Sequence, residues 1–509
     1  MTTYSDDENG VQELKGDSAL VTGGTANQDP VCLEKLRTVF SEHLVYKSAH
    51  KNKSLQALGI PSYLRDWLVK RFSDENGNID IDEVNQFVKT HIPRRKDWES
   101  LKSRMVNDAQ SIRLLVKIRA EVDVKTGEGL FSLPDLGFPT KKYQAIIPKT
   151  LGKDKRDALV KSPETWGVID LQWDRLEIQG QKEEGRVFIS EFKPFCPYEV
   201  ELDYYQEARR EFSLDEWIDV LITAIDYNPS GYLSNNEKVT MLTRLTPLLE
   251  KNLNLVELAP KGTGKSYLFS QISKHGWLVS GGSVSRARLF YDISKSSVGL
   301  VGRHDYVALD EIQSISFPDI EEIRGALKGY LESGDYAVGD YKGRGEAGLI
   351  LLGNIEQSLM NENKNMFREL PRMFHESALL DRFHGFIKGW DIPRMTESMK
   401  AEGWGLNVEF FSEILHALRS DLRYRAVVDK MLHVPAGSDT RDTEAVKRLT
   451  TAYIKLLFPH WTKTEEVDSA QLEEFCLNRA MRMRATIRKQ LNVMDHEYLD
   501  TMPAITVSP

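Results

Sequence analysis

A glycine-rich segment near the middle of the chain has the residue types needed to hold a nucleotide phosphate. In LNLVELAPKGTGKSYLFSQI an apolar run precedes Gly262 and Gly264, and an amphipathic run follows them. Glycines let the backbone curl so that amide N–H groups point at phosphate oxygens, and a helix starting there adds its positive end. Lys265 would reach the β- and γ-phosphates, and the Ser266 hydroxyl would ligate Mg²⁺. Ala259 occupies the first glycine position of the GxxxxGK[ST] pattern, and a strand exit tolerates alanine there.

The nucleotide contacts predicted from this turn extend over the whole loop and into the helix after it. We expect contacts from Pro260, Lys261, Gly262, Thr263, Gly264, Lys265, Ser266 and Tyr267. A chance turn of this composition is the alternative, but the strand-like and helix-like flanks lie on the correct sides for a phosphate-binding loop. ATP with Mg²⁺ is therefore the expected cofactor.

Two adjacent acids end a second apolar run, DYVALDE, further along the chain. At the carboxyl edge of a parallel sheet such acids face a bound nucleotide. We expect Asp310 to hold Mg²⁺, through water, and Glu311 to orient and polarise the attacking water. An apolar strand ending in Asp-Glu is a weak signal by itself. Together with the Gly-Lys-Ser loop at this spacing, it predicts an ATP hydrolase.

A polar residue and two arginines complete the candidate catalytic set. The apolar run 348–353 ends at Asn354, whose amide could hydrogen-bond the attacking water or the γ-phosphate; a turn-forming asparagine is the alternative. Arg382, at the end of the apolar stretch ALLDR, is expected to act across a subunit interface as an arginine finger. A plain surface arginine is the alternative for Arg382, and Arg372 is a second candidate for the finger.

One more basic residue is expected to contact the γ-phosphate from the helical segment near the C-terminus. Lys447 and Arg448 are both candidates for this sensor role, and several other basic residues compete with them. We include Arg448 in the nucleotide-binding set.

These side chains need a parallel sheet to bring them together, and the order of predicted elements supplies one. Strand, glycine-rich turn, helix, acid-ended strand and Asn-ended strand alternate as an α/β sheet requires. Ser213 and Glu216 form a capping-box pattern that opens the helix EWIDVLITAI before the core. The expected organisation is a disordered tail (1–29), a mixed α+β domain that binds DNA (30–205), an ATPase core (206–394), a helical lid with C-terminal helices (395–498) and a short tail (499–509).

Composition limits the protein's setting more than its partners. The net charge is −9, so a nucleic-acid surface would have to be local. The three cysteines, Cys32, Cys196 and Cys476, lack metal-ligand spacing and fit a reducing compartment. The first ten residues lack a basic start and an apolar stretch, and the apolar runs are too short to span a bilayer. We therefore expect a cytoplasmic protein that contacts no membrane.

Longer segments resemble a known family. GYLESGDYAVGDYKGRGEAGLILLGN looks like the hairpin that precedes the sensor strand in one branch of the AAA+ ATPases. EWIDVLITAIDYNPSGY, ELAPKGTGKSYLFSQIS, LVSGGSVSRARLFYDI and GLVGRHDYVALDEI together resemble the BrxL family, Lon-related ATPases of bacterial BREX phage-defence systems. The likeness is strongest from about Phe212 to Phe458 and weaker around TWGVIDLQW.

The resemblance implies an assembly and a partner. It implies a hexameric ring, single or stacked as a dimer of hexamers, that binds or threads double-stranded DNA and meets other BREX components. It also implies an N-terminal domain like that of replicative MCM helicases. The functional positions of the family fall on Lys265, Asp310, Glu311, Asn354 and Arg382. Many relatives carry a C-terminal Lon-like protease domain with a Ser/Lys pair, which the short remainder here cannot hold, so no peptidase activity is expected.

The residues decide less clearly between DNA and protein as the substrate. Lys142 and Lys149 lie in a basic stretch that could contact phosphate or be a solvated loop, and Lys342 and Arg344 lie in a hairpin of near-neutral charge. The stretch 296–299 lacks the aromatic residue of unfoldase pore loops. Three functions stay open: a DNA-translocating ring, a protein-remodelling chaperone, and a DNA-clamping scaffold whose assembly ATP controls.

Overall fold

The computed structural model describes most of the chain. It covers residues 30–47, 60–74, 77–161, 164–176, 184–294 and 297–508. The predicted tail 1–29 and Ser296 lie outside the described residues.

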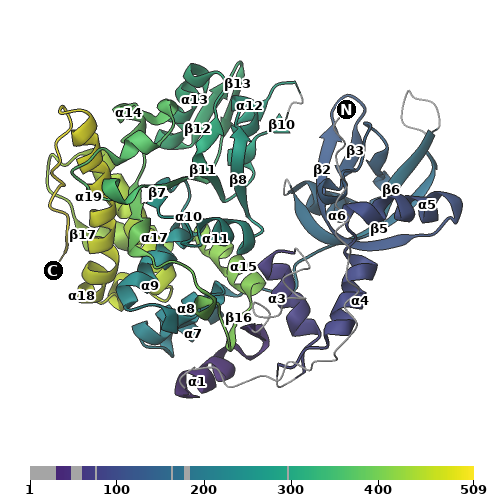
Figure 1. Cartoon of the computed structure of the whole chain (residues 1–509), viewed down its shortest axis with the longest axis horizontal. Helices are drawn as coiled ribbons and strands as arrows, with labels where there is room; N and C mark the ends of the chain where they lie inside the picture. Colours follow the sequence, from purple (N-terminus) through teal and green to yellow (C-terminus); the bar gives the residue numbers. More distant parts are fainter. Residues whose placement is uncertain are drawn as a thin grey trace, which may run out of the picture.

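A five-stranded parallel sheet lies at the centre of the molecule (Figure 1). Its strand order is β15-β7-β14-β11-β8, and each pair of neighbours is parallel. The strands are β7 (Leu255–Ala259), β8 (Gly276–Ser283), β11 (Tyr306–Ser316), β14 (Gly348–Asn354) and β15 (Gly385–Lys388). Because all the strands run the same way, their carboxyl ends lie at one edge of the sheet. The predicted α/β core is confirmed.

Alternate residues of the central strands enter two different apolar cores. In β14, Ile350 and Leu352 belong to one buried cluster, whereas Leu349 and Leu351 belong to the other. A strand covered on both faces is expected to be apolar throughout, and β7 (LVELA) is buried at every position. Its one charged residue, Glu257, is fully buried.

Helices cover both faces of the sheet. The first core includes residues of α8 (Leu214–Ala224), α9 (Asn235–Leu242), α10 (Thr246–Leu249), α11 (Lys265–Gln271), α15 (Val408–Arg419), α16 (Arg423–Met431) and α17 (Thr440–Leu457). The second core includes residues of α12 (Arg286–Leu289), α13 (Ile320–Ser333), α14 (Ser377–Leu380) and α19 (Asn478–Met494). The predicted capping box of α8 is confirmed, since the Ser213 N–H donates to Glu216 Oε2 at 2.7 Å and the Glu216 N–H to Ser213 Oγ at 3.3 Å.

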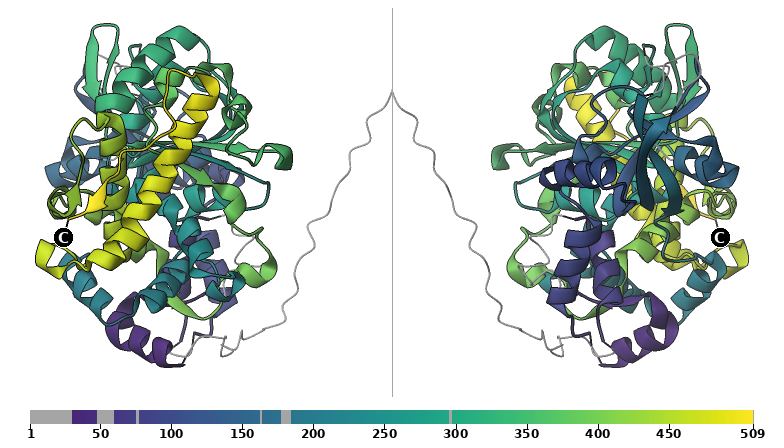
Figure 2. Two further views of the ribbon diagram at one scale, coloured as in Figure 1. Left: turned by 90° about the vertical axis from the view of Figure 1, so that its left-hand side faces the viewer. Right: turned by 90° about the vertical axis from the view of Figure 1, so that its right-hand side faces the viewer.

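A closed five-stranded barrel stands beside the sheet core (Figure 1, and the right-hand view of Figure 2). Its strands are β2 (Ile112–Asp123), β3 (Glu128–Ser132), β4 (Ala145–Ile147), β5 (Thr165–Leu176) and β6 (Glu184–Pro194), in the order β2-β3-β4-β6-β5. Only β4 and β6 pair in parallel among these described strands. Helix α5 (Trp98–Asn107) precedes the barrel, and α6 (Lys153–Lys161) lies between β4 and β5. Helices before a sheet match the predicted mixed α+β domain.

The N-terminal helices pack against the sheet core rather than against the barrel alone. These are α1 (Pro30–Phe40), α3 (Ser62–Arg71) and α4 (Ile81–His91), with β1 (Leu44–Tyr46) after α1. Strand β1 pairs antiparallel with β16 (Trp404–Leu406), far along the chain, and α3 contacts α15. The segment before the barrel therefore packs against the part of the chain that contains the glycine-rich loop.

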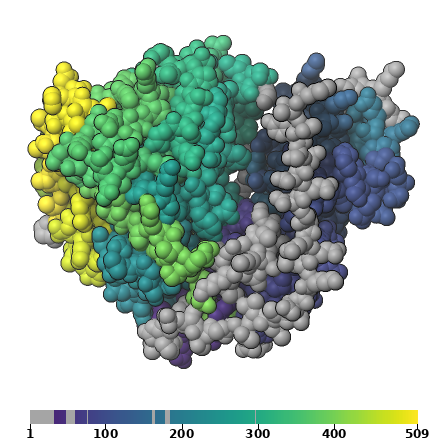
Figure 3. Space-filling model, in the orientation of Figure 1, coloured from purple at the N-terminus to yellow at the C-terminus, as the bar shows by residue number. Residues whose placement is uncertain are grey.

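The C-terminal part covers the side of the core opposite the barrel (Figures 1 and 3). It is mostly helical, with α18 (Ser469–Gln471) and a π-helical turn (Leu472–Leu477) leading into α19. Two short strands, β17 (Leu432–His433) and β18 (Thr506–Val507), pair antiparallel, so the predicted tail contains a paired segment. No helix in the described part of the chain is long and apolar enough to cross a membrane.

Candidate functional site

The loop between β7 and α11 has the backbone that phosphate binding requires. Gly262 and Gly264 have φ of +85° and +77°, in the left-handed region that glycine adopts readily. Gly264 is the N-cap of α11. The first backbone N–H groups of this helix, which have no partner within the helix, therefore lie beside the loop. A side chain at position 264 would also collide, because its Cβ would lie 2.5 Å from the Tyr227 hydroxyl.

Four of the predicted catalytic and metal-binding residues lie together at this edge of the sheet. Ser266 Oγ donates to Asp310 Oδ2 at 2.5 Å. Lys265 Nζ lies 3.3 Å from Asn354 Oδ1; Lys265 comes after β7, and Asn354 is the last residue of the neighbouring strand β14. Burial lowers the pKa of Lys265 from its ordinary value, and the Glu257 carboxylate acts against that shift.

Glu311 occupies a strained position beside the other four. Its φ is +49°, and its side chain is exposed. Strand β11 does not end at Asp310 and Glu311 as predicted: it continues to Ser316, and its pairing with β8 shifts register between Asp310 and Ile315. Glu311 lines an open cavity of about 790 Å³, together with Lys261 and Asn354. Backbone strain of this kind costs about 1–3 kcal/mol, and such strained residues cluster at functional sites.

The donor set fits a magnesium-bound nucleotide. A hydroxyl and a carboxylate in contact supply the hard oxygen ligands that Mg²⁺ prefers, and a lysine beside them supplies the cation for phosphate. The oxygens of Ser266 and Asp310 and the amine of Lys265 are these groups. The predicted residues can therefore act on one ligand.

Arg382 lies at the opposite edge of the sheet from the loop in the same chain. It precedes the first residue of β15, Gly385, which is in register with Leu255 at the start of β7. Arg382 Nε forms an ion pair with Glu332 Oε2 at 2.8 Å, and Arg372 is exposed on the 3-10 helix Arg372–Phe374. Within one chain, Arg382 is therefore too far from the loop to contact a nucleotide bound there.

The prediction that Arg448 joins the nucleotide contacts is not met within one chain. Arg448 Nη1 donates to the carbonyl of Lys251 at 2.7 Å, and Lys251 precedes β7. Arg448 therefore lies at the amino edge of the sheet, with Arg382. Lys447 forms an ion pair with Asp429 at 2.7 Å. Sequence spacing placed both residues on the correct helix but could not show which sheet edge that helix meets.

Two further residues, Arg244 and Gln313, support the loop and the sensor strand, although no motif of the sequence includes them. Arg244, on the 3-10 helix Thr243–Leu245, forms a buried ion pair with Glu257 at 2.6 Å. Gln313 Nε2 donates to the carbonyl of Asn354 at 2.7 Å, which fixes the end of β14. Arg394 is exposed and lines the same cavity as Glu311. For the Arg244–Glu257 pair the sequence does carry one signal. Glu257 is a glutamate inside an apolar strand, and a buried carboxylate needs a partner.

A buried polar network connects the loop helix to the N-terminal helices. The hydroxyl of Tyr267 donates to Asp226 Oδ2 at 3.0 Å and accepts from Arg65 at 3.1 Å. Lys47 Nζ lies 2.5 Å from Asp66 and 2.9 Å from Asp226, and the side chain is fully buried. Burial opposes the charge, but Asp226 and Asp66 raise the pKa of Lys47 above its ordinary value. Tyr267 thus has a structural role besides the predicted nucleotide contact.

Comparison with known families agrees with the geometry of this site. The model of the Lon-like protease BrxL-like ATPase domain matches residues 187–504. The chain belongs to the BrxL family. A second model, the N-terminal domain of the BREX system Lon protease-like protein BrxL, matches residues 38–173. The first match contains the sheet, the loop and all five predicted catalytic residues.

Two curated BrxL proteins are similar over most of this chain. The Lon-like protease BrxL of Escherichia coli O9:H4 (strain HS) is 27% identical over 465 residues. The protein of the same name from Bacillus cereus (strain H3081.97) is 28% identical over 469 residues. The alignments cover 90% and 89% of this chain, and the chain spans 64% and 66% of the two relatives.

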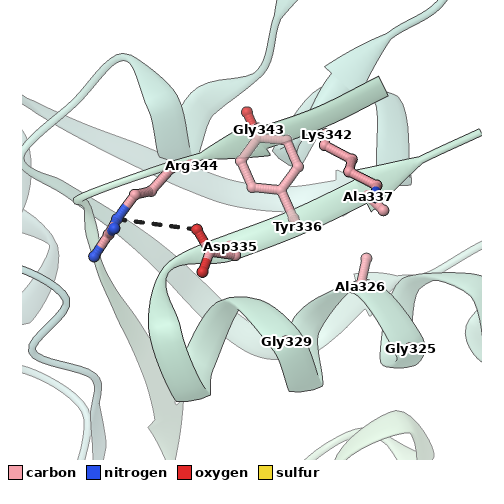
Figure 4. Close-up of a pocket in the computed structure, with 9 residues that line it drawn as sticks. All are labelled: Gly325, Ala326, Gly329, Asp335, Tyr336, Ala337, Lys342, Gly343 and Arg344. Atoms are coloured by element: carbon pink, nitrogen blue, oxygen red, sulfur yellow. Dashed lines mark ion pairs between the residues drawn. The ribbon is translucent and has the colours of Figure 1, made fainter. Parts of the chain in front are cut away.

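Within the BrxL ATPase domain, the predicted pre-sensor hairpin forms as β12 (Asp335–Val338) and β13 (Tyr341–Arg344). Lys342 and Arg344 lie on its exposed face, and Arg344 forms a long ion pair of 4.0 Å with Asp335 (Figure 4). On the other face Tyr341 stacks on Tyr291 with ring centroids 3.6 Å apart. The ring of Tyr291 comes from β9 (Tyr291–Asp292), which pairs with β10 (Ser297–Val298), so two hairpins support each other.

The region matched by the BrxL N-terminal model contains the two predicted basic residues of the barrel. Lys142, between β3 and β4, forms an ion pair with Asp123 at 2.5 Å. Lys142 and Tyr143 hold the pKa of Asp123 below its ordinary value. Lys149 follows β4 and is exposed, and within the described ranges no ion pair is found for it. Lys142 and Lys149 flank β4, but the ion pair with Asp123 already neutralises Lys142.

Proposed function

We propose that the chain is an ATP-hydrolysing AAA+ motor of BREX defence that assembles into a ring, binds double-stranded DNA and translocates on it. The observation that carries the proposal is the Ser266–Asp310 contact beside the Lys265–Asn354 contact, at the start of a glycine-capped helix. A hydroxyl, a carboxylate, a lysine and an amide converge there on the place where a triphosphate would lie.

Each residue has a separate task in hydrolysis. The loop amides and Lys265 would bind the phosphates, and Ser266 with Asp310 would hold Mg²⁺, which neutralises charge developing on the phosphates. Glu311 lies free of this cluster and faces the cavity, where it would accept a proton from water and orient it. Asn354, fixed by Gln313, would hold the γ-phosphate or that water.

The position of Arg382 favours an assembly. Its edge of the sheet is opposite the loop, so a ring in which neighbours meet edge to edge would bring it to the next subunit's nucleotide. An arginine supplied in trans stabilises transition-state charge and contributes about 10³–10⁵ in rate. Arg448 lies at the same edge and could join it there.

The barrel and the hairpin supply a candidate DNA-binding surface. The strand order of the barrel, with its third and fifth strands parallel, is that of the OB fold, which binds oligonucleotides on the face of its second and third strands. Lys142 and Lys149 flank that third strand, β4. Lys342 and Arg344 would contact phosphate without reading sequence.

A protein substrate is the second candidate function, because both curated relatives are named Lon-like proteases. The discriminating experiment measures ATP hydrolysis by the full chain with duplex DNA of mixed sequence and with a permanently unfolded protein. The motor proposal predicts stimulation by DNA and a loss of that stimulation in Lys342→Ala/Arg344→Ala. Stimulation by unfolded protein alone would support a remodelling chaperone and overturn the DNA proposal.

The third candidate, a DNA clamp whose assembly ATP controls, needs binding but no turnover. Glu311→Gln separates it from the motor. If phage protection persists at full strength when this variant no longer hydrolyses ATP, the protein acts as a clamp. The motor proposal predicts that protection is lost.

A further inference from the structure

Arg244 has every N–H of its guanidinium committed to a specific acceptor. Nε donates to Glu257 Oε2 at 3.0 Å, and Nη2 donates to Glu257 Oε1 at 2.6 Å. Nη1 donates to the carbonyl of Thr263 at 2.7 Å and contacts the Met241 sulfur at 3.0 Å. Nη2 also reaches Thr263 Oγ1 at 3.3 Å. A guanidinium has five N–H donors in a rigid fork, and five acceptors surround this one.

Stability alone does not explain this pair. Both side chains are fully buried, and a buried ion pair costs about as much in lost hydration as its attraction returns. Apolar residues of similar size are often neutral or stabilising at such positions. The pair must therefore be explained by what it holds, and it holds Thr263, the residue between the two left-handed glycines.

The contact with Thr263 sets the direction of a neighbouring amide. In a trans peptide group the C=O and N–H point to opposite sides, so a carbonyl held toward Arg244 directs the Gly264 N–H away from it. The preceding peptide group is held in the same way, since the Met395 N–H donates to the Gly262 carbonyl at 2.8 Å. The Thr263 N–H is then directed away from Met395. Two successive amides are oriented before any ligand arrives.

We propose that Arg244 and Glu257 are positioning residues that hold the loop carbonyl of Thr263 and thereby preset the amides of the phosphate-binding loop. The inference rests on the proposed nucleotide binding and adds residues that never touch the nucleotide. Preset amides lower the ordering cost of binding, so their loss weakens nucleotide affinity in the ground state and the transition state alike.

Two variants separate positioning from folding. Arg244→Met/Glu257→Met removes both charges at once, so no unpaired charge stays buried and the core can still pack. Arg244→Lys keeps the charge but has three donors for five acceptors. Arg209→Lys is the matched control. Arg209 is a buried arginine that donates to the carbonyls of Leu457 and Phe212, and within the described part of the chain it forms no hydrogen bond with the loop.

The experiment titrates each full-length protein with a slowly hydrolysed ATP analogue and Mg²⁺, and measures melting without nucleotide. The double variant should melt near the wild-type temperature but bind the analogue at least about tenfold more weakly, because the loop amides must then be ordered when the nucleotide binds. Arg244→Lys should weaken binding in the same direction, and Arg209→Lys should bind like the wild type. KM for ATP should rise in Arg244→Met/Glu257→Met and in Arg244→Lys, while kcat at saturating ATP changes little.

A second readout needs no ligand. Amide hydrogen exchange of the peptide covering 258–268 should be faster in the double variant than in the wild type. A folded double variant with wild-type affinity and unchanged exchange would overturn the positioning role. If the double variant does not fold, Arg244→Lys is the test, and wild-type affinity in Arg244→Lys would overturn the positioning role. A wild type that binds no analogue would overturn the proposed function itself, together with this inference.

Discussion

Ser266 Oγ lies 2.5 Å from Asp310 Oδ2, although Ser266 belongs to helix α11 and Asp310 to strand β11. Ser266 is in the first turn of α11, and Asp310 follows the part of β11 that pairs with β14. The contact brings the two predicted metal ligands together, one from each motif. The two motifs therefore belong to one site.

Glu311→Gln should separate nucleotide binding from hydrolysis. Glutamine keeps the shape of the side chain but cannot accept a proton from water, so turnover should fall by about 10²–10⁴. Affinity for ATP should stay within a few-fold, because Glu311 lies outside the Ser266–Asp310 contact. Parallel measurements of ATP hydrolysis and of analogue binding check this. Wild-type turnover in the variant would exclude Glu311 as the residue that activates water.

Arg382→Ala should bind ATP but hydrolyse it about 10³-fold more slowly or worse, because the arginine acts across an interface. Mixing Arg382→Ala with Glu311→Gln subunits should restore part of the activity, since some interfaces then combine an intact Glu311 with an intact Arg382. Arg372→Ala is the comparison variant. Activity that survives Arg382→Ala but not Arg372→Ala would assign the finger to Arg372.

The sequence was sufficient to predict the residues that meet at the carboxyl edge. Lys265, Asp310 and Asn354 each come after an apolar run of the sequence, and parallel strands bring such residues to one edge of the sheet. Arg448 could not be placed in the same way, because its position depends on how α17 packs against the start of β7. That packing is a contact between segments almost two hundred residues apart, and local pattern carries no information about it.

The same limit applies to Arg244 and to the strand irregularity at Glu311. The buried Glu257 indicates that some partner exists, but many arginines could fill that role, and the 3-10 helix of Arg244 has no pattern of its own. The run DYVALDE predicts a strand that stops at the acids. The chain instead continues in β11, because a register shift lets Ile315 pair again with β8.

Lys47→Met should destabilise the fold strongly. Asp66 and Asp226 would stay buried without the cation between them, and breaking a buried pair costs about 3–5 kcal/mol. Lys35→Met is the matched control, because the Lys35–Glu216 pair is partly exposed and such pairs contribute about 1 kcal/mol or less. Denaturant unfolding of the two variants measures the difference. An equal loss of unfolding free energy in the two variants would show that the buried Lys47 network does not stabilise the packing of the N-terminal helices on the sheet core.

Stability should depend on pH through His416. The Asp305 carboxylate, 2.7 Å away, raises the pKa of His416 above its ordinary value, so the folded state binds the proton more tightly than the unfolded state. The stabilisation is therefore fully present below the unfolded value of about 6.5 and is lost as pH rises through the folded pKa.

The test compares melting of the wild type and His416→Gln across pH. The difference in Tm should be larger near about pH 5.5 than near about pH 8.5. In an Asp305→Asn background that pH-dependent part should disappear. A difference that stays constant with pH would show that the imidazole contributes packing only, through its stack on His275 at 3.9 Å.

The most direct measurement is calorimetric titration of the full chain with Mg²⁺ and a slowly hydrolysed ATP analogue. The wild type and Lys430→Ala, a change on the exposed end of α16, should show the same saturable binding. Lys265→Ala should lose at least about a hundredfold in affinity, because a charge-assisted contact to phosphate is removed. Binding that is absent in the wild type in every state of assembly, or unchanged in Lys265→Ala, would contradict the account.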